Sequence, residues 1–157
     1  MKKKIILLKK KLNYSTKNNS KIINRIFNHF ISKNNQQKIF KSFYLSTNEI
    51  KKMSSMGMCI GSHGHSHHLL SNLNFNEQKL EIQKSKNFLE NLLKKKIHHF
   101  CFPFGGPESY NSNTLKILRN LNFRNSFTVE NKPLPKKINY YEIPRLDCNI
   151  FRFGKLN

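Results

Sequence analysis

A chain of 157 residues is long enough for one domain with a buried core and is short for a complete large barrel. Its 29 Lys and Arg against 8 Asp and Glu give a formal net charge of +21, which would attract nucleic acid, anionic lipid or anionic glycan. The acidic residues are scattered, so their spacing offers no paired-carboxylate site of the kind that glycosidases use.

The basic residues are spread along the whole chain and lack the interleaved aromatic residues of a nucleic-acid stacking platform. A general bias toward Lys, Asn and Ile accounts for them, and we expect no specific nucleic-acid partner. The alternative function is a non-catalytic basic module that binds anionic glycan or nucleic acid, whose affinity would fall steeply with added salt. Cys59, Cys101 and Cys148 are far apart, which indicates neither a disulfide framework nor a zinc knuckle.

Residues 1–20 are rich in Lys and Asn and are predicted to be a poorly ordered basic segment, with residues 21–157 forming one domain. The apolar run in MKKKIILLKKK is too short for a signal peptide or a membrane span. We therefore expect a cytoplasmic protein without a transmembrane segment. A first helix is predicted where apolar residues recur at helical spacing, at Ile22, Ile23, Ile26, Phe27, Phe30 and Ile31.

Two capping boxes predict the next helices. The motif Ser46-Thr47-Asn48-Glu49 precedes a short helix to about Met56, and Asn74 with Glu77 precedes a long helix to about Lys96. Between them, the apolar run Met58-Cys59-Ile60 predicts a short buried strand that ends at Gly61.

The second half of the chain continues this alternation. A strand at His99 to Phe102, a helix through Thr114 to Leu121 and a strand at Asn125 to Val129 are followed by a proline-rich loop and an extended segment from Tyr140 to Leu146. Alternating strands and helices predict an α/β fold with a parallel sheet, whose functional sites lie at the carboxyl ends of the strands.

The stretch GSHGHSHH (61–68) holds four of the seven histidines and follows the first predicted strand. His63 and His67 are four residues apart, so a turn at Gly64 brings both rings toward one divalent cation, whereas His65 and His68 point elsewhere. Zinc in a catalytic site normally takes three protein ligands, so a third must come from elsewhere in the protein. The alternative interpretation is a surface histidine-rich turn with adventitious metal affinity.

The histidine motif in its context, MGMCIGSHGHSH followed by Leu69-Leu70, resembles the polysaccharide deacetylase family, whose domains are also called NodB-homology domains or carbohydrate esterase family four. The segment Phe102 to Gly106 with Tyr110-Asn111 looks like the family's groove-wall motif, and Pro144 to Asp147 looks like a later strand-end motif.

This resemblance implies a partial, deformed (β/α) barrel of the NodB-like type. It also implies a divalent metal, usually Zn²⁺, bound by His63 and His67, and hydrolysis of N- or O-acetyl groups on a carbohydrate or glycan precursor. The substrate-binding residues that it implies are Pro103, Phe104, Gly105, Tyr110 and Arg145.

The chain departs from the family pattern at the catalytic groups. No Asp-Asp pair precedes His63, Cys101 stands where the family has an arginine, and no later Leu-x-His motif supplies an acid. The catalytic residues are therefore unassigned, with Asp147 and Glu108 as the only candidates. We expect a carboxyl-terminal portion of a deacetylase or a non-catalytic relative, either of which would be weakly active or inactive. His98 and His99 are interpreted as structural.

Overall fold

The computed structural model describes residues 19–146, 151–152 and 155–156. Most of the basic segment predicted at residues 1–20 lies outside the described residues, as do Asp147 and Cys148. The chain divides into two compact units, residues 1–56 and 57–157, and each is described by itself.

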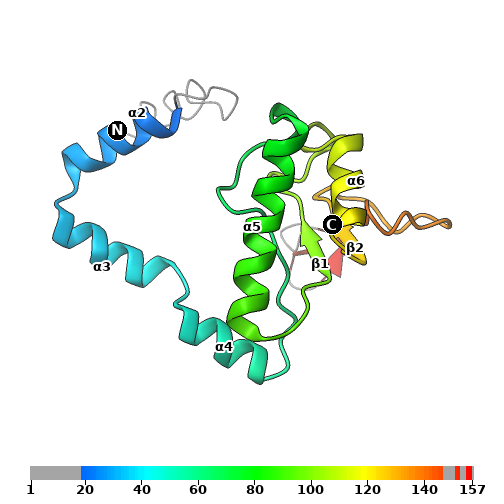
Figure 1. Ribbon diagram of the computed structural model, residues 1–157, viewed down its shortest axis with the longest axis horizontal. Helices are drawn as coiled ribbons and strands as arrows, with labels where there is room; N and C mark the ends of the chain where they lie inside the picture. Colours follow the sequence, from blue (N-terminus) through cyan, green and yellow to red (C-terminus); the bar gives the residue numbers. More distant parts are fainter. Residues whose placement is uncertain (1–18, 147–150, 153–154, 157) are drawn as a thin grey trace. The chain divides into compact units, whose positions relative to one another are not determined.

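The described residues of the first unit form the helices α2 (Asn19–Phe30), α3 (Lys33–Phe43) and α4 (Thr47–Ser55) (Figure 1). The predicted capping box is present: Glu49 N donates to Ser46 Oγ at 3.2 Å, and Ser46 N donates to Glu49 Oε2 at 2.7 Å. Helix α3 was not predicted, because its sequence KNNQQKIFKSF is polar over its first six residues and carries no apolar repeat there.

The described residues of the second unit include a long helix, a short helix and two short parallel strands. Helix α5 (Phe75–Leu93) begins at the predicted Asn74–Glu77 capping box, and α6 (Ser112–Asn120) begins at a further one. Strand β1 (His99–Cys101) pairs in parallel with β2 (Asn125–Phe127), with Phe100 opposite Ser126. The 3₁₀ turns η1 (Leu70–Asn72) and η2 (Pro107–Ser109) lie in the connections, and β3 (Phe151–Arg152) and β4 (Lys155–Leu156) pair antiparallel.

Single parallel bridges extend the β1–β2 pair on both sides, at Ser62 beside Phe100 and at Ile143 beside Phe127. Four chain segments thus lie next to one another in sequence order, all parallel, as they do in part of a (β/α) barrel. The carboxyl ends of these segments meet at one edge, which is where the histidine cluster follows Ser62.

The strand predicted at Met58–Ile60 is wrong. Pairing occurs only at Ser62, whose N–H donates to His99 O and whose carbonyl accepts from Cys101 N, both at 2.9 Å. Met58 is 50% exposed and Cys59 is exposed, so this apolar run is not buried as its composition suggested. Within the described residues the run has no partner strand, and a short apolar run alone does not fix a strand.

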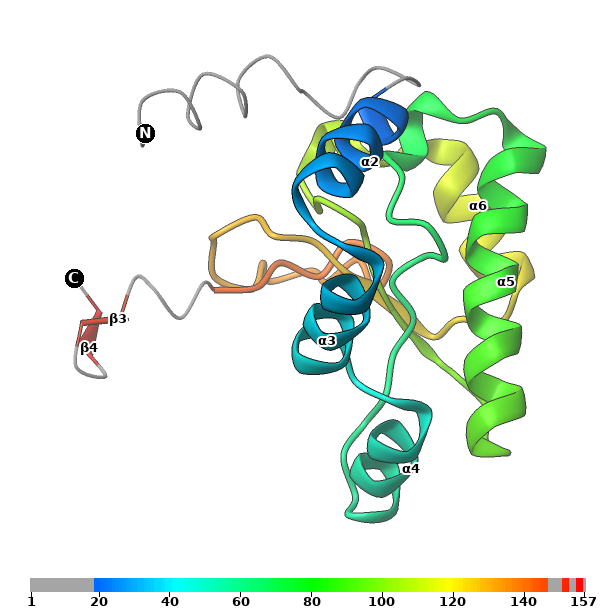
Figure 2. The same ribbon diagram turned by 90° about the vertical axis from the view of Figure 1, so that its left-hand side faces the viewer.

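The core of the second unit lies between the strands and the two helices, which cover the same side of the strands (Figure 2). Phe100 and Phe102 of the β1 region are at most 1% exposed, and their rings meet edge to face at 5.6 Å. Burial of each such side chain contributes about 1.5–3 kcal/mol. The buried apolar cluster is Leu70, Ile82, Ile97, Phe100, Phe102, Ile117, Leu118 and Phe123.

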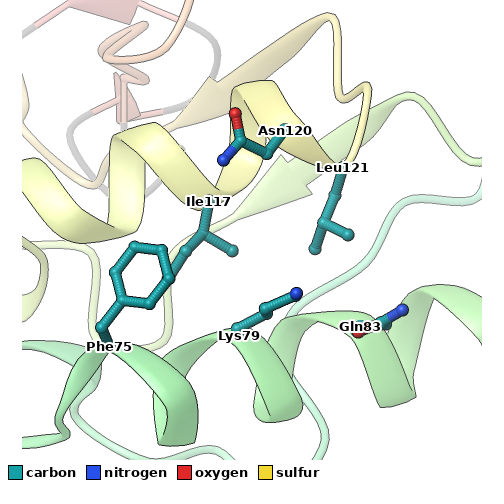
Figure 3. A pocket seen from close by; sticks show the side chains of 6 residues that line it. All are labelled: Phe75, Lys79, Gln83, Ile117, Asn120 and Leu121. Atoms are coloured by element: carbon teal, nitrogen blue, oxygen red, sulfur yellow. The ribbon is translucent and has the colours of Figure 1, made fainter.

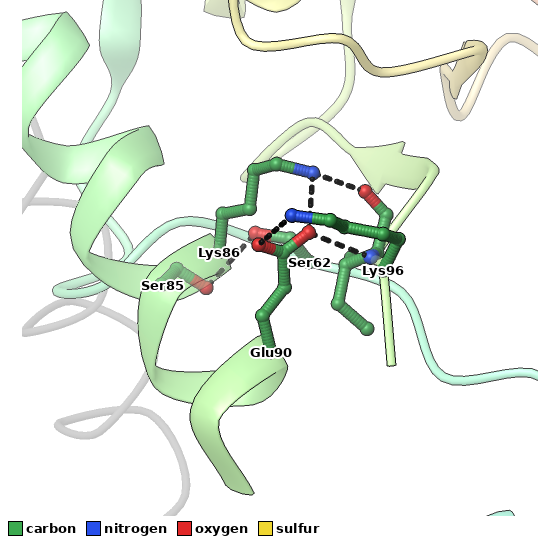
Figure 4. A network of polar contacts seen from close by, with 6 residues as sticks. Ser62, Ser85, Lys86, Glu90 and Lys96 are labelled. Atoms are coloured by element: carbon green, nitrogen blue, oxygen red, sulfur yellow. Dashed lines mark hydrogen bonds and ion pairs between the residues drawn. The ribbon is translucent and has the colours of Figure 1, made fainter. Parts of the chain in front are cut away.

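A buried lysine joins α5 to the chain entering β1 (Figure 4). Lys86 is 9% exposed; its Nζ donates to Ile97 O and lies 3.0 Å from Glu90 Oε1 and 4.5 Å from the centroid of the Phe123 ring. Glu90 in turn accepts from Ile97 N at 3.0 Å. The charge of Lys86 is therefore matched by an anion, a carbonyl and a ring face, as a buried ammonium group requires.

Helices α5 and α6 leave a small hollow of about 200 Å³ between them, on the side away from the strands (Figure 3). Its lining residues are Phe75, Lys79, Gln83, Ile117, Asn120 and Leu121. None of the histidines lines this hollow. Among the described residues, no helix is long and apolar enough to cross a membrane.

Candidate functional site

A groove of about 500 Å³ opens where the chain leaves the bridge at Ser62 and where β1 ends. It is an open surface groove rather than an enclosed cavity, and its walls come from the carboxyl ends of all four parallel segments and from the turn after β1. Its lining residues are Gly61, Ser62, His63, Cys101, Phe102, Phe104, Val129 and Arg145.

The ring of His63 is held by the backbone of the neighbouring strand. His63 Nδ1 lies 2.8 Å from Cys101 O, and a carbonyl oxygen only accepts hydrogen bonds, so Nδ1 must carry the proton. The neutral ring then presents the lone pair of Nε2, which is the form in which histidine binds a metal. The fold therefore fixes both the orientation and the tautomer of His63.

The ring of His67 lies beside that of His63, with ring centroids 5.0 Å apart. His67 adopts a left-handed backbone conformation at φ 55°, and Gly64 precedes it at φ 80°. These two residues turn the chain back, as the sequence predicted for Gly64. On its other side His67 contacts the ring of Phe104 edge to face at 4.7 Å. The pair His63–His67 thus forms one cluster at the groove.

The surroundings favour the neutral form of His63. Partial removal of its ring from water lowers the pKa below the ordinary value of 6.5, and the nearby His67 and Arg145 lower it further, against the opposing effect of the Cys101 carbonyl. Burial likewise raises the pKa of the Cys101 thiol, although Arg145 partly opposes this. At neutral pH the groove holds a neutral imidazole and a neutral thiol.

Arg145 crosses from the last parallel segment to the groove. Its Nε donates to Thr128 O at 2.9 Å, and its Nη1 lies 3.6 Å from Cys101 Sγ. The guanidinium group is thereby fixed at the groove wall, while Arg145 itself remains exposed. Arg145 and Phe104 are the two predicted substrate-binding residues that line the groove.

The other predicted substrate-binding residues lie behind this wall. Pro103 and Gly105 are buried, and Gly105 has φ 72°. Tyr110 stacks on Phe102 with ring centroids 4.0 Å apart, and its hydroxyl donates to Glu142 Oε1 at 3.0 Å. These three residues shape the groove rather than line it, and their role in binding a substrate stays a prediction.

The two candidate catalytic acids are not brought to the histidines by the described structure. Glu108 is exposed in η2, its carboxylate oxygens lie against Gly106, and it does not line the groove. Asp147 lies outside the described residues. Neither assignment is tested by this geometry.

The remaining histidines of the second unit divide into two groups. His65 and His68 are exposed, and in the described contacts neither shares a hydrogen bond or ring contact with the groove. His99 is structural, because its Nδ1 lies 2.7 Å from Asn125 Oδ1 and joins β1 to β2. His98 contributes its carbonyl, which accepts from Arg124 N at 2.8 Å.

The residues at the groove fit part of a metal site. Two imidazole rings that lie side by side suit a divalent transition metal such as zinc. Among the described residues, however, no group of three or more His, Cys, Asp or Glu side chains is placed to hold one ion. The described chain therefore offers two ligands where a catalytic zinc site has three.

Two backbone contributions to the site had no signal in the sequence. The Cys101 carbonyl that holds His63 belongs to a residue whose side chain appeared to be a departure from the family, and the Thr128 carbonyl anchors Arg145 from β2's end. Carbonyl groups are present at every residue, so only the parallel register of the segments reveals which ones face the site.

The family model described as polysaccharide deacetylase matches residues 13–126 of the chain. No curated protein sequence matches it.

Several solved structures share the fold. The deacetylase PplD of Streptococcus pyogenes, determined in complex with acetate, is 24% identical with a TM-score of 0.60, over 65% of this chain and 44% of that one. The BpsB deacetylase domain from Bordetella bronchiseptica is 14% identical with a TM-score of 0.60, over 66% and 49%. A polysaccharide deacetylase from Bacillus cereus is 22% identical with a TM-score of 0.57, over 65% and 32%.

The chain thus spans less than half the length of each of these three proteins. The likeness confirms the partial α/β barrel of NodB-like type that the sequence predicted.

Proposed function

This chain belongs to the polysaccharide deacetylase family, and we propose that its groove is the metal-binding and sugar-binding part of a hydrolase that removes N- or O-acetyl groups from carbohydrate. The observation that carries the proposal is the His63–His67 pair. The hydrogen bond to Cys101 O leaves His63 Nε2 free, and the ring of His67 lies 5.0 Å away by centroid at the open groove.

The ion that we propose is Zn²⁺, because imidazole nitrogens are among its preferred ligands. A bound divalent metal would polarise an acetyl carbonyl and lower the pKa of a coordinated water. The chain's own contribution is to hold His63 as the Nδ1–H tautomer and to keep it neutral through the lowered pKa, so that no proton has to be displaced before the metal binds.

The groove wall suggests how an acetylated sugar would be held. Phe104 offers an apolar ring beside His67, and Arg145 offers guanidinium N–H groups fixed by Thr128 O. A few oriented donors on an otherwise apolar wall are typical of small-molecule sites. The guanidinium N–H groups of Arg145 would donate to a carbonyl or hydroxyl oxygen of the sugar, and the Phe104 ring would cover its C–H face.

We propose that this chain hydrolyses acetyl groups slowly or not at all. None of the described residues that line the groove is a carboxylate, so no general base is seen beside the histidines. A positioned general base contributes about 10²–10⁴-fold to the rate, and a third metal ligand would add affinity for the ion.

The test is acetate release from acetylated chito-oligosaccharides by the purified, zinc-loaded chain, compared with His63→Ala and with His65→Ala as the matched control. We expect release at least about 10²-fold below an ordinary turnover of about 10 s⁻¹, abolished in His63→Ala and unchanged in His65→Ala. Turnover at ordinary enzyme rates would contradict the claim that the groove lacks a general base. If the wild type releases acetate at a measurable rate, equal release by His63→Ala would contradict the role of the histidine pair.

A further inference from the structure

The loop that carries the two histidines has little backbone support of its own. In the described part of the chain, no backbone–backbone hydrogen bond involves residues 63–68, although bonds are present on both sides of this stretch. The loop also contains a non-glycine residue, His67, in the left-handed region at φ 55°, which such residues adopt only when the surroundings hold them there. Contacts with side chains must therefore fix its course.

One of these contacts comes from helix α5. Ser66 N donates to Glu81 Oε2 at 2.8 Å, which is within the range of strong hydrogen bonds to a charged acceptor. The Ser66 N–H belongs to the peptide unit that joins His65 to Ser66, so this bond holds the backbone one residue before the left-handed His67. Glu81 is half-buried, and no other carboxylate is hydrogen-bonded to a described backbone amide of this loop.

The same helix holds the other side of His63. Ser62 Oγ donates to Ser85 Oγ at 2.9 Å, and this pair is buried (Figure 4). Glu81 and Ser85 are four residues apart on α5, so they lie one above the other on one helix face. Their partners, Ser66 and Ser62, are also four residues apart. Helix α5 is thus hydrogen-bonded to the chain on both sides of His63, at Ser62 and at Ser66.

We propose that Glu81 is a positioning residue for the His63–His67 pair, acting through the Ser66 amide to hold His67 beside His63. This inference rests on the proposed metal-binding function of the pair. Glu81 contacts neither ring in the described structure; it acts on the backbone that carries His67, as partners outside the ligand set do in metal sites generally. Ser85 supplies the fixed point on the other side of His63.

Two substitutions of Glu81 distinguish the effect of its hydrogen bond to Ser66 N from the effect of its negative charge. The amide oxygen of Glu81→Gln still accepts from Ser66 N, whereas Glu81→Ala removes the acceptor. Lys84→Ala is the matched control, because Lys84 is exposed on the same helix and a truncation there leaves the Ser66 contact in place. All variants are made in the full chain, and their thermal unfolding is recorded to confirm that they fold.

Two measurements test whether Glu81 positions the His63–His67 pair. Zinc titration should show about tenfold weaker binding in Glu81→Ala, binding within about threefold of wild type in Glu81→Gln, and no change in Lys84→Ala. Hydrogen exchange at the Ser66 amide, measured without metal, should be at least tenfold faster in Glu81→Ala and restored in Glu81→Gln.

Unchanged zinc affinity in Glu81→Ala, or an equal loss in Glu81→Gln, would overturn the proposal. Failure of the wild-type chain to bind zinc would instead refute the proposed function. In that case the Ser66 exchange rates alone decide whether Glu81 holds the loop. Faster exchange in Glu81→Ala supports a role of the Glu81–Ser66 hydrogen bond in holding the loop, and unchanged exchange refutes it.

Discussion

Replacing Gly105 by alanine should destabilise the turn behind the groove, whereas the same change at the next residue should not. Gly105 has φ 72°, and a Cβ there would lie 2.7 Å from Val129 Cγ1 and 3.0 Å from Val129 N. The left-handed conformation costs an alanine about 1–2 kcal/mol, and overpacking against Val129 costs about 1–3 kcal/mol more. The bond from Val129 N to Gly105 O, 2.9 Å long, would be displaced as well.

Gly106 provides the matched control. Its φ of −71° suits any residue, and the three atoms nearest to a Cβ there belong to the carboxylate of Glu108, which is the end of a flexible, exposed side chain. The expected cost of Gly106→Ala is therefore within about 0.5 kcal/mol.

Urea unfolding at equal m-values measures both free energies. We expect a loss of about 2–5 kcal/mol for Gly105→Ala. Equal stabilities of the two variants would refute the reasoning from backbone conformation and close approach.

Two further predictions concern stability. Lys86→Met should lower the free energy of unfolding by about 1.5–3 kcal/mol, because Ile97 O and Glu90 lose a charged hydrogen-bond partner. Urea unfolding measures this loss, with Lys84→Met as the exposed control. Equal stabilities of the two variants would show that the buried contacts of Lys86 do not stabilise the fold. For His63, the lowered pKa contributes stability that is present above pH 6.5 and is lost as the pH falls through the lowered value, since the unfolded state then binds the proton more readily. Acidification from pH 7 to about 5 should therefore destabilise the wild type more than His63→Asn, and parallel pH profiles would show that desolvation of His63 has no effect.

Local signals in the sequence predicted much of the fold. The capping boxes at Ser46 and Asn74 set the first turns of α4 and α5, because a capping box needs only residues three apart. The strand at His99 was predicted because the short run His99 to Phe102 follows a predicted helix and ends at the break formed by Pro103 to Gly106. The same criterion failed at Met58, where no partner strand is present among the described residues.

The sequence predicted which histidine side chains form the candidate site, but not the groups that hold them in place. The spacing of His63 and His67 and the glycine between them indicated that the rings converge, and their centroids lie 5.0 Å apart. The groups that hold these rings come from residues distant in the sequence: Cys101 O through the parallel register, and Glu81 through a helix face. Neither partner follows from a periodic pattern, because tertiary structure alone brings them to the loop.

The most direct test of the central claim, that His63 and His67 bind one metal ion, is a calorimetric zinc titration of the wild-type chain and of His63→Ala, His67→Ala and His65→Ala. His65 is the control because it lies in the same exposed loop and shares no described contact with the pair. The account predicts weak binding of one zinc per chain, abolished by either of the first two substitutions and retained in His65→Ala. Equal losses in all three variants would show an adventitious histidine cluster and contradict it.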